Sequence, residues 1–224
     1  MKKSLWKNLE VIATVDGVTQ GLDSWDATGV SIDSRNTVKG DIFIALKGNN
    51  HDGHRYVNDA FKKGAIAAII QDIPNQINKN KAYIKVDNTY QALDNLAVLG
   101  RNRNDCKLLG ITGSVGKTTT KDYLYAILNE HSNCHANKFN YNNRIGVPLS
   151  LAQIPRDCDY VVQEMGMSNF NEILKLSEIA KPNLALITAI GGSHLENFQS
   201  LKDIAIAKSE IFKHMTKDGI AILP

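Results

Sequence analysis

The pattern of apolar and polar positions changes character about halfway along the chain. In the first half, short apolar or alternating runs between polar turns predict strands over residues 29–33, 41–46, 66–70 and 83–86. A short helix is predicted over 56–63, because Gly64 is a typical C-terminal stop. A longer helix begins at Thr89, which we expect to cap it. The first half is therefore predicted to be a small mixed α/β domain.

Longer elements alternate regularly in the second half. Apolar runs predict strands over residues 107–112, 160–164, 184–188 and 219–223, and helical patterns cover 117–131, 171–180 and 201–213. Continuous apolar strands that alternate with helices indicate βαβ units around a mostly parallel sheet. The polar run 102–105 separates the halves. We therefore expect an α/β protein with domains at 1–104 and 105–224.

The last predicted strand ends directly before Pro224, the final residue. A nucleotide-binding sheet that begins near residue 107 would then stop after its fourth strand. We therefore expect the central domain to be incomplete in this chain and a C-terminal domain to be absent.

Composition narrows the class of protein. Of the 224 residues 43% are hydrophobic, which is enough for real cores in one or two domains. The 26 basic and 23 acidic residues give a net charge of +3 without a basic block, which argues against nucleic acid as a partner. Cys106, Cys134 and Cys158 have neither disulfide nor zinc spacing. This cysteine usage favours a reducing cytosol, and no apolar run approaches the roughly 18 residues of a membrane span, so we expect a cytoplasmic protein. We also expect a monomer.

The most informative stretch is 108–120, which reads LLGITGSVGKTTT. An apolar strand runs into glycines spaced by two residues, then a lysine, threonines and a helical pattern. Such glycines let backbone N–H groups surround an anion, and the helix adds its positive end. Lys117 can then reach the β- and γ-phosphates, while the Thr118 hydroxyl is placed for Mg²⁺. The expected ATP-binding residues are Gly113, Ser114, Val115, Gly116, Lys117, Thr118 and Thr119.

This loop departs from the common P-loop spacing. That spacing requires glycine at position 111, where this chain has Ile111, so the motif is the variant GxxGxxGKTT. A Gly-Lys-Thr sequence also occurs in ordinary surface turns. The strand–loop–helix context favours a nucleoside triphosphate site.

Two polar residues follow the next strands of the second half. Glu164 ends a buried strand, and a buried carboxylate is costly unless it is paired or bound to metal, so we predict a Mg²⁺ ligand. A helix cap or a solvated strand end is the alternative. His194 follows paired glycines after the third strand. Ligands gather at the carboxyl ends of parallel strands, which favours a functional histidine over a structural one.

Two further features are ambiguous on their own. Lys208 lies among apolar residues of a predicted helix, and the simplest interpretation is a lysine that extends its amine to solvent. Residues 137–148 contain four asparagines within seven positions, which predicts a polar loop. Amides at Asn142 and Asn143 suit phosphates and sugar hydroxyls, although an ordinary surface loop remains the alternative.

Taken together, these residues resemble the Mur ligases of peptidoglycan synthesis. The first half carries DSRNTVKGDIFIALKG over 33–48, followed by Asp52-Gly53-His54. The second half carries the GxxGxxGKTT loop, IGVP at 145–148, EMG at 164–166, HLE at 194–196 and AKSE at 207–210. The loop is shared with folylpolyglutamate synthases. The NNxIGVP and HLENF runs resemble the members that add D-Ala-D-Ala rather than the sister enzymes that add the third residue.

The resemblance implies a role for each candidate. Ser34, Arg35, Lys47, Gly48 and His54 would bind the UDP end of the substrate, with Asn142 and Asn143 also substrate-binding. Thr118 and Glu164 would hold one Mg²⁺, and His194 would help to bind a second. Lys208 matches a carbamylated lysine, whose CO₂ adduct is a metal-binding carboxylate. Lys117, His194 and Lys208 would be the catalytic residues.

The implied reaction is ATP-driven amide formation between UDP-MurNAc-tripeptide and D-Ala-D-Ala through an acyl phosphate. Because complete family members are longer, we expect this chain alone to bind the UDP sugar, to bind nucleotide weakly, and to lack ligase activity. Two alternatives stay open. One is a non-catalytic binding fragment or half of a split enzyme. The other is a different Mur-type ligase or a folylpolyglutamate synthase-like ligase. The 33–48 motif counts against the folylpolyglutamate synthase-like ligase.

Overall fold

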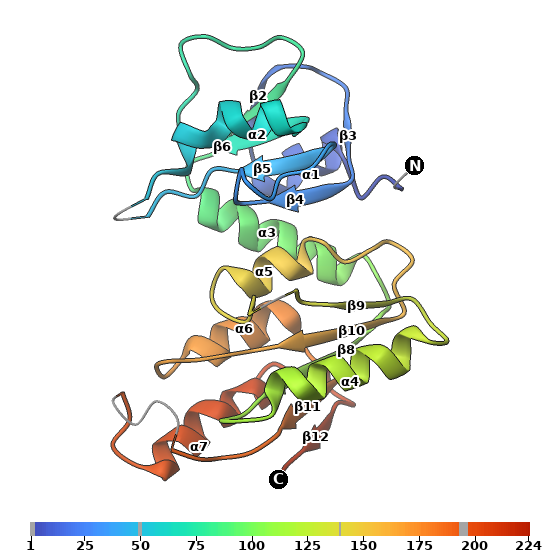
Figure 1. Cartoon of the computed structure of the whole chain (residues 1–224), viewed down its shortest axis with the longest axis vertical. Helices are drawn as coiled ribbons and strands as arrows, with labels where there is room; N and C mark the ends of the chain where they lie inside the picture. Colours follow the sequence, from blue (N-terminus) through green and yellow to red (C-terminus); the bar gives the residue numbers. More distant parts are fainter. Residues whose placement is uncertain (1–2, 49–50, 139, 193–196) are drawn as a thin grey trace. The chain divides into compact units, whose positions relative to one another are not determined.

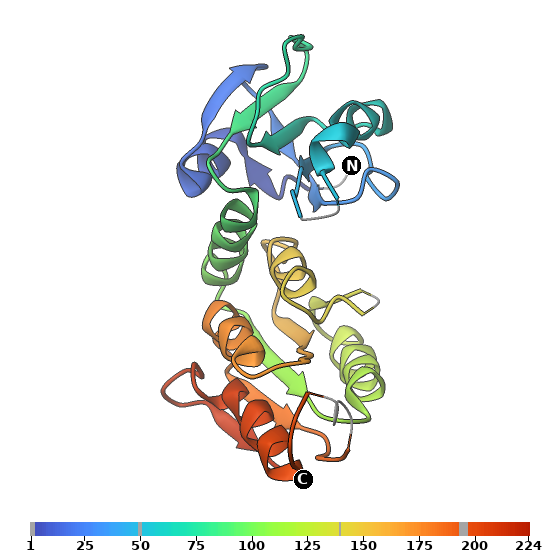
Figure 2. The same ribbon diagram turned by 90° about the vertical axis from the view of Figure 1, so that its left-hand side faces the viewer.

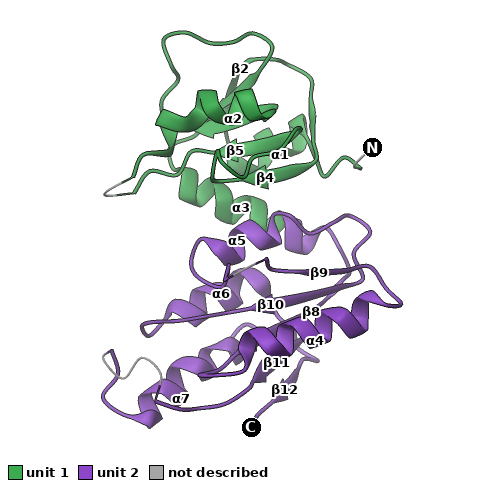
Figure 3. Ribbon diagram, viewed as in Figure 1, with its two compact units in different colours: residues 1–99 green, residues 100–224 purple. Residues whose placement is uncertain are grey.

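The computed structural model describes residues 3–48, 51–138, 140–192 and 197–224 (Figure 1). The chain divides into two compact units, residues 1–99 and residues 100–224 (Figure 3). Both units are built of helices around a mainly parallel sheet, which confirms the predicted α/β class. In the described part of the chain, no helix is both long and apolar enough to cross a bilayer.

The first unit contains a five-stranded sheet. In spatial order its strands are β2 (Val18–Gly21), β7 (Ala82–Lys85), β6 (Ala67–Ile70), β5 (Asp41–Ile44) and β4 (Gly29–Ser31). Only the β2–β7 pair is antiparallel. The helical elements are α1 (Asn8–Val15), the 3₁₀ helix η1 (Gly53–Tyr56), α2 (Val57–Lys63) and α3 (Thr89–Asn102), which crosses the division between the units. A two-stranded ribbon pairs β1 (Trp6–Lys7) with β3 (Asp26–Ala27).

The predicted elements of the first unit are confirmed with small shifts in their bounds, but one helix cap is wrong. Gly64 ends α2 in the left-handed conformation, with φ of 110°, as expected for a glycine stop. The α3 cap is Asn88 rather than Thr89. The Asn88 side-chain oxygen accepts hydrogen bonds from the N–H groups of Tyr90 and Gln91, at 2.9 and 3.1 Å. Thr89 is fully buried, because tertiary packing covers it.

The second unit is a three-layer α/β structure. Its strands, in spatial order, are β12 (Ile220–Ile222), β11 (Leu184–Ile187), β8 (Lys107–Thr112), β10 (Tyr160–Glu164) and β9 (Cys134–Ala136), and every described pair is parallel. Its helices are α4 (Lys117–Asn129), α5 (Gly146–Leu151), α6 (Glu172–Ala180), α7 (Leu201–Ser209) and the 3₁₀ helix η2 (Glu210–Phe212). Figure 2 shows α4 on one side of this sheet and α6 and α7 on the other.

The sequence pattern predicts β8 and β10 at the bounds that the structure shows. The Asn-rich stretch is shorter than the predicted loop 137–148, because α5 begins at Gly146. Pro148 lies in the first turn of this helix, where its missing N–H costs no hydrogen bond. The parallel sheet places β8 between β10 and β11, so the segments that follow these three strands meet at one edge.

Candidate functional site

The glycine-rich loop connects β8 to α4 through Gly113–Gly116. Gly113 has φ of 152°, and a Cβ atom there would collide with the hydroxyl of Thr188. Gly116 is the N-cap of α4 and has φ of 83°, in the region that glycine adopts without strain. Both positions therefore require glycine for local reasons, as the motif predicts.

Contacts with the segment after β11 hold this loop in place. The Thr188 hydroxyl donates to the Val115 carbonyl at 2.6 Å. Ser114 donates its N–H to the Ala189 carbonyl at 2.9 Å, and its hydroxyl accepts from the Gly191 N–H at 2.9 Å. Ser114 is thus a loop anchor. The same segment leads to His194, which lies outside the described residues.

The side chains at the start of α4 face the mouth of the loop. Lys117 donates from Nζ to the Gly113 carbonyl at 2.7 Å, so the ammonium lies across the loop. Thr118 and Thr119 are exposed in the first turn of the helix. The first turn of a helix offers free N–H groups and a partial positive charge. This end of the second unit is therefore suited to an anionic ligand.

Glu164 is the centre of the site. It is 2% exposed at the end of β10. Its Oε2 accepts a hydrogen bond from the Thr118 hydroxyl at 2.8 Å, and its Oε1 accepts one from the Asn142 amide at 2.7 Å. Its own N–H donates to the Asn137 side-chain oxygen at 2.9 Å. Two neutral donors thus orient a buried carboxylate beside the loop, an arrangement that suits a divalent cation.

The two asparagines predicted to bind substrate both have structural partners. Asn142 turns toward Glu164, while its carbonyl accepts from the Gly166 N–H at 2.7 Å. The Asn143 side-chain oxygen accepts from the N–H groups of Ile145 and of Gly146, the first residue of α5, at 3.1 and 2.8 Å. The Asn-rich stretch therefore holds Glu164 in place through hydrogen bonds and is not an ordinary surface loop.

Lys208 lies close enough to Lys117 for their charges to interact. It is 2% exposed on α7, and burial lowers its pKa to about 8, with the positive charge of Lys117 adding to the shift. Within the described ranges, no hydrogen bond or ion pair of its ammonium is found. The fold therefore brings the charges of Lys208 and Lys117 within interacting range, although the separation of the two residues in the sequence gives no sign of it.

The sequence analysis did not identify one buried lysine near this site. Lys121 is 5% exposed on α4, and its ammonium contacts the Asn137 carbonyl at 3.3 Å and Asp122 at 3.1 Å. Because Asn137 also accepts from the Glu164 backbone, Lys121 supports the same cluster from behind. Its position four residues after Lys117, on the same helix face, was the available signal.

A second group of predicted residues lies in the first unit, after β4. Arg35 forms a bidentate ion pair with Asp33, in which Nε donates to Oδ1 at 3.0 Å and Nη2 donates to Oδ2 at 2.8 Å. The hydrogen bonds from Arg35 hold the pKa of Asp33 below its usual value. The Arg35 side chain is 87% exposed, whereas Ser34 is buried. Arg35 is therefore open to an anionic ligand.

The loop after β5 carries the other predicted residues of this unit. Lys47 and Asp52 form an isolated antiparallel bridge, and the Gly48 N–H donates to the His51 carbonyl at 2.8 Å. His54 has both ring nitrogens engaged. Its Nε2 accepts from the Gln71 N–H at 2.8 Å, so its Nδ1 carries the proton and donates to Asp52 at 2.7 Å. These contacts give His54 a role in holding the loop.

Two cavities of the second unit lie at the other end of the sheet. One of about 590 Å³ and another of about 470 Å³ are both lined by Lys107 and Tyr160, the first residues of β8 and β10, among other residues. The glycine-rich loop and Glu164 are at the opposite ends of the same strands.

Family models match most of the chain. The Mur ligase middle domain matches residues 111–224, and the model described as the Mur ligase family, catalytic domain, matches residues 26–101. The chain is similar to the UDP-N-acetylmuramoyl-tripeptide–D-alanyl-D-alanine ligases of Rickettsia prowazekii and Bacillus subtilis. It is 42% identical to each, over 90% and 87% of its own length. It spans only 44% and 42% of those two proteins.

Solved structures of MurF proteins are also similar to this chain. The structure is similar to MurF from Acinetobacter baumannii, with a TM-score of 0.86 and 33% identity over 98% of this chain and 48% of that one. It is also similar to MurF from Thermotoga maritima in complex with ADP, with a TM-score of 0.74 and 31% identity. That match covers 87% of this chain and 45% of the other.

Proposed function

Because this chain belongs to the Mur ligase family, we propose that it carries the substrate- and phosphate-binding parts of an ATP-dependent ligase. The ligase would join UDP-MurNAc-tripeptide to D-Ala-D-Ala. One observation carries the proposal: buried Glu164 is oriented by Thr118 and Asn142 beside the glycine-rich loop. The similarity to D-alanyl-D-alanine ligases over most of the chain supports the choice of substrates.

The glycine-rich loop would bind the phosphates of ATP. Its shape follows from Gly113 and Gly116, and the first turn of α4 supplies N–H donors and a positive end. Lys117 would exchange the Gly113 carbonyl for a phosphate oxygen, because a charged acceptor binds an ammonium more strongly. The similar MurF from Thermotoga maritima, solved in complex with ADP, supports a nucleotide at this loop.

The residues beside the loop fit Mg²⁺. Thr118 and Glu164 offer a hydroxyl and a carboxylate oxygen 2.8 Å apart, and Mg²⁺ prefers oxygen ligands. The bound ion would neutralise charge on the phosphates and on the attacking carboxylate. Asn142 would keep the Glu164 carboxylate in its orientation. A second metal position that uses His194 and Lys208 rests on the family resemblance.

Lys208 has the properties that carbamylation requires. The nucleophile toward CO₂ is the neutral amine, and burial lowers the Lys208 pKa to about 8, so a sizeable fraction is neutral near pH 7.5. The amine nitrogen would attack the carbon of CO₂, form an N–C bond, and release its proton to solvent. The resulting carbamate would replace the buried cation of Lys208 by an anion. The repulsion between the positive charges of Lys117 and Lys208 would become an attraction between opposite charges.

The first unit would bind the UDP end of the substrate. Arg35 presents an exposed guanidinium, whose permanent positive charge suits the oxygens of a diphosphate. Ser34, Lys47 and Gly48 lie on the loops that follow β4 and β5. His54 would act indirectly, because Asp52 and Gln71 occupy its ring nitrogens.

The proposed reaction has two steps. The terminal carboxylate of the tripeptide attacks the γ-phosphorus of ATP, which gives an acyl phosphate and ADP. The amine of D-Ala-D-Ala then attacks the acyl carbon, and phosphate leaves through a tetrahedral intermediate. Lys117 would stabilise charge that moves onto the phosphate oxygens, and alignment of the two reactants would supply much of the acceleration.

Nucleotide binding by residues 1–224 tests the phosphate site. We expect ADP with Mg²⁺ to bind weakly, and Lys117→Met to lower this affinity by at least about 10-fold through loss of a charge-assisted hydrogen bond. Lys107→Met, at the other end of β8, is the matched control. Equal affinity of both variants and the wild type would contradict the assignment.

The substrate and the reaction are tested separately. Titration with UDP-MurNAc-tripeptide should show binding to residues 1–224, and absence of binding by a folded chain would contradict the substrate assignment. We expect no phosphate release from ATP when both substrates are present, because this chain spans less than half of its relatives. Release that requires both substrates would show that these residues suffice for turnover.

A further inference from the structure

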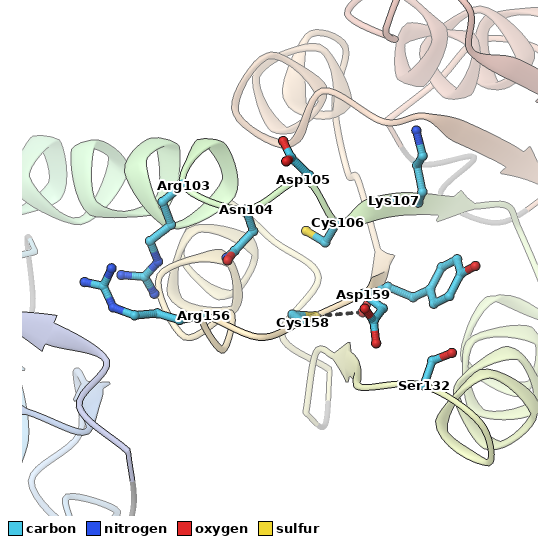
Figure 4. Close-up of a pocket in the computed structure, with 10 residues that line it drawn as sticks. Arg103, Asn104, Asp105, Cys106, Lys107, Ser132, Arg156, Cys158 and Asp159 are labelled. Carbon is cyan, nitrogen blue, oxygen red and sulfur yellow. Dashed lines mark hydrogen bonds between the residues drawn. The ribbon is translucent and has the colours of Figure 1, made fainter.

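Two cysteines line one cavity of the second unit, away from the glycine-rich loop. Cys106 precedes β8 and Cys158 precedes β10, and both face the cavity of about 590 Å³ shown in Figure 4. Each residue is largely buried, with 4% and 7% of its surface exposed. The cavity gives a small molecule access to sulfur atoms that the protein surface otherwise covers. The proposed ligase reaction uses neither of them.

The strand register places Cys106 beside the segment that contains Cys158. Lys107 pairs with Tyr160, and the Lys107 N–H donates to the Asp159 carbonyl at 2.9 Å, so Cys106 lies next to the residues that directly precede β10. Cys158 is one of these residues, and its thiol donates to the Tyr160 carbonyl at 3.0 Å. A disulfide needs Cα atoms about 4.4–6.8 Å apart, a separation that residues of neighbouring parallel strands, about 4.8 Å apart, can meet.

The surroundings make the two sulfur atoms unequal. The neighbouring Cys158 thiol lowers the pKa of Cys106 to about 7, against the opposing effect of burial, and Arg101 adds to the lowering. The Arg101 guanidinium lies 3.9 Å from the Cys106 sulfur. Its other recorded hydrogen bonds, such as those to the Ala180 carbonyl and the Asn183 side chain, go to neutral oxygen atoms. The Cys106 thiol, together with burial, raises the pKa of Cys158.

We propose that Cys106 and Cys158 form a thiol–disulfide exchange site that reacts with a low-molecular-weight disulfide entering through this cavity. The Cys106 thiolate attacks one sulfur of the small disulfide, and the other half leaves as a thiolate. Cys158 then loses its proton and attacks the Cys106 sulfur. A Cys106–Cys158 bond forms and the second small thiolate leaves. The protein dithiol is oxidised and one external disulfide is reduced to two thiols.

The third cysteine provides an internal control. Cys134 lies on β9, and burial raises its pKa to about 11, so little thiolate forms at neutral pH. It is half-buried and lies outside the lining of this cavity. Under the proposal, access and charge both favour Cys106 over Cys134 as the attacking thiol.

The test uses glutathione disulfide as the probe on residues 1–224 at pH 7.5. Samples are quenched with acid, free thiols are alkylated, and the peptides are mapped by mass spectrometry. The wild type and Cys134→Ser should form the Cys106–Cys158 disulfide. Cys158→Ser should accumulate glutathione on Cys106, because the resolving thiol is missing. Cys106→Ser should gain neither modification at Cys158.

A second measurement separates reactivity from folding. Circular dichroism confirms that each variant is folded, and the rate of Cys106 alkylation is followed against pH. The wild-type midpoint should lie near pH 7, and Cys158→Ala should shift it upward, because the neighbouring thiol that lowers the pKa of Cys106 is removed. The proposal is overturned if Cys106 and Cys134 react at equal rates, or if folded Cys158→Ser traps no adduct on Cys106. An unchanged midpoint in Cys158→Ala would also overturn it.

Discussion

The two units place polar residues at the ends of similar parallel sheets but hold them in opposite ways. In the second unit, Glu164 and Lys208 are each only 2% exposed, and Glu164 is fixed by two hydrogen bonds from side chains of other segments. In the first unit, the Arg35 side chain is 87% exposed, and its partner Asp33 lies two residues away. One site is built into the packed interior, and the other lies on surface loops.

This difference has an energetic consequence. Charges in a poorly hydrated interior interact strongly with their neighbours, and one altered atom leaves a partner without compensation. An exposed ion pair is screened by water and salt and contributes little to stability. We therefore expect substitutions in the second unit to change both stability and ligand affinity, and substitutions at Arg35 to change affinity alone.

The largest expected effect is that of Glu164→Gln. The amide keeps the size of the side chain but removes the negative charge that would hold Mg²⁺. Loss of a residue that only orients a metal ligand costs about 10–100-fold in affinity, so loss of the ligand should cost at least about 100-fold. Titration with a fluorescent ADP analogue, with Mg²⁺ and with chelator, measures this metal-dependent component.

Glu178→Gln is the matched control for that experiment, because Glu178 is an exposed carboxylate on α6 of the same unit. It should bind the ADP analogue like the wild type. Retention of the full Mg²⁺ dependence in Glu164→Gln would remove Glu164 from the metal site and with it the contrast between the units.

A smaller effect is expected for Arg35→Ala in the first unit. The affinity for UDP-MurNAc-tripeptide should fall about 10-fold, because one charge-assisted contact is lost. The thermal midpoint should not change, because the ion pair with Asp33 is exposed. Lys62→Ala, which removes an exposed ion pair with Asp59 in the same unit, should change neither quantity. A clear fall in the thermal midpoint of Arg35→Ala would contradict the distinction between the units.

The smallest expected effect is a pH dependence caused by Lys208. Its proton leaves near pH 8 in the folded chain and near 10.5 in the unfolded chain. Between these values the unfolded state binds more protons, so the free energy of unfolding rises with pH. In Lys208→Met no buried amine has to lose its proton, so the free energy of unfolding lacks this dependence on pH. The stability advantage of this variant over the wild type should therefore shrink by about 1 kcal/mol between pH 7 and pH 9.

Urea unfolding in CO₂-free buffer at the two pH values measures this change, since carbamylation would otherwise alter the charge of Lys208. Lys202→Met, an exposed position on the same helix, should show no such trend. A stability difference between Lys208→Met and the wild type that is the same at both pH values would place the Lys208 ammonium in contact with water.

Much of the fold was predictable because its signals are local. The apolar runs of β8 and β10 and the glycine stop at Gly64 depend on neighbouring residues only. The helices α1 and α5 and the strands β1, β2, β3 and β9 were missed. Most of them are very short strands, whose patterns are too brief to stand out. The Asn88 cap was missed because two adjacent residues, Asn88 and Thr89, were both suitable.

The sequence by itself determined the family and the position of the glycine-rich loop, since the glycines and lysine of GxxGxxGKTT lie within one short segment and the family models confirm the resemblance. Only the tertiary structure decided which polar groups meet. Thr118 and Glu164 are 46 positions apart, and the order of the strands brings them together. The same packing buries Lys208 and gives His54 two structural partners. Such contacts depend on the arrangement of whole elements, which no local pattern encodes.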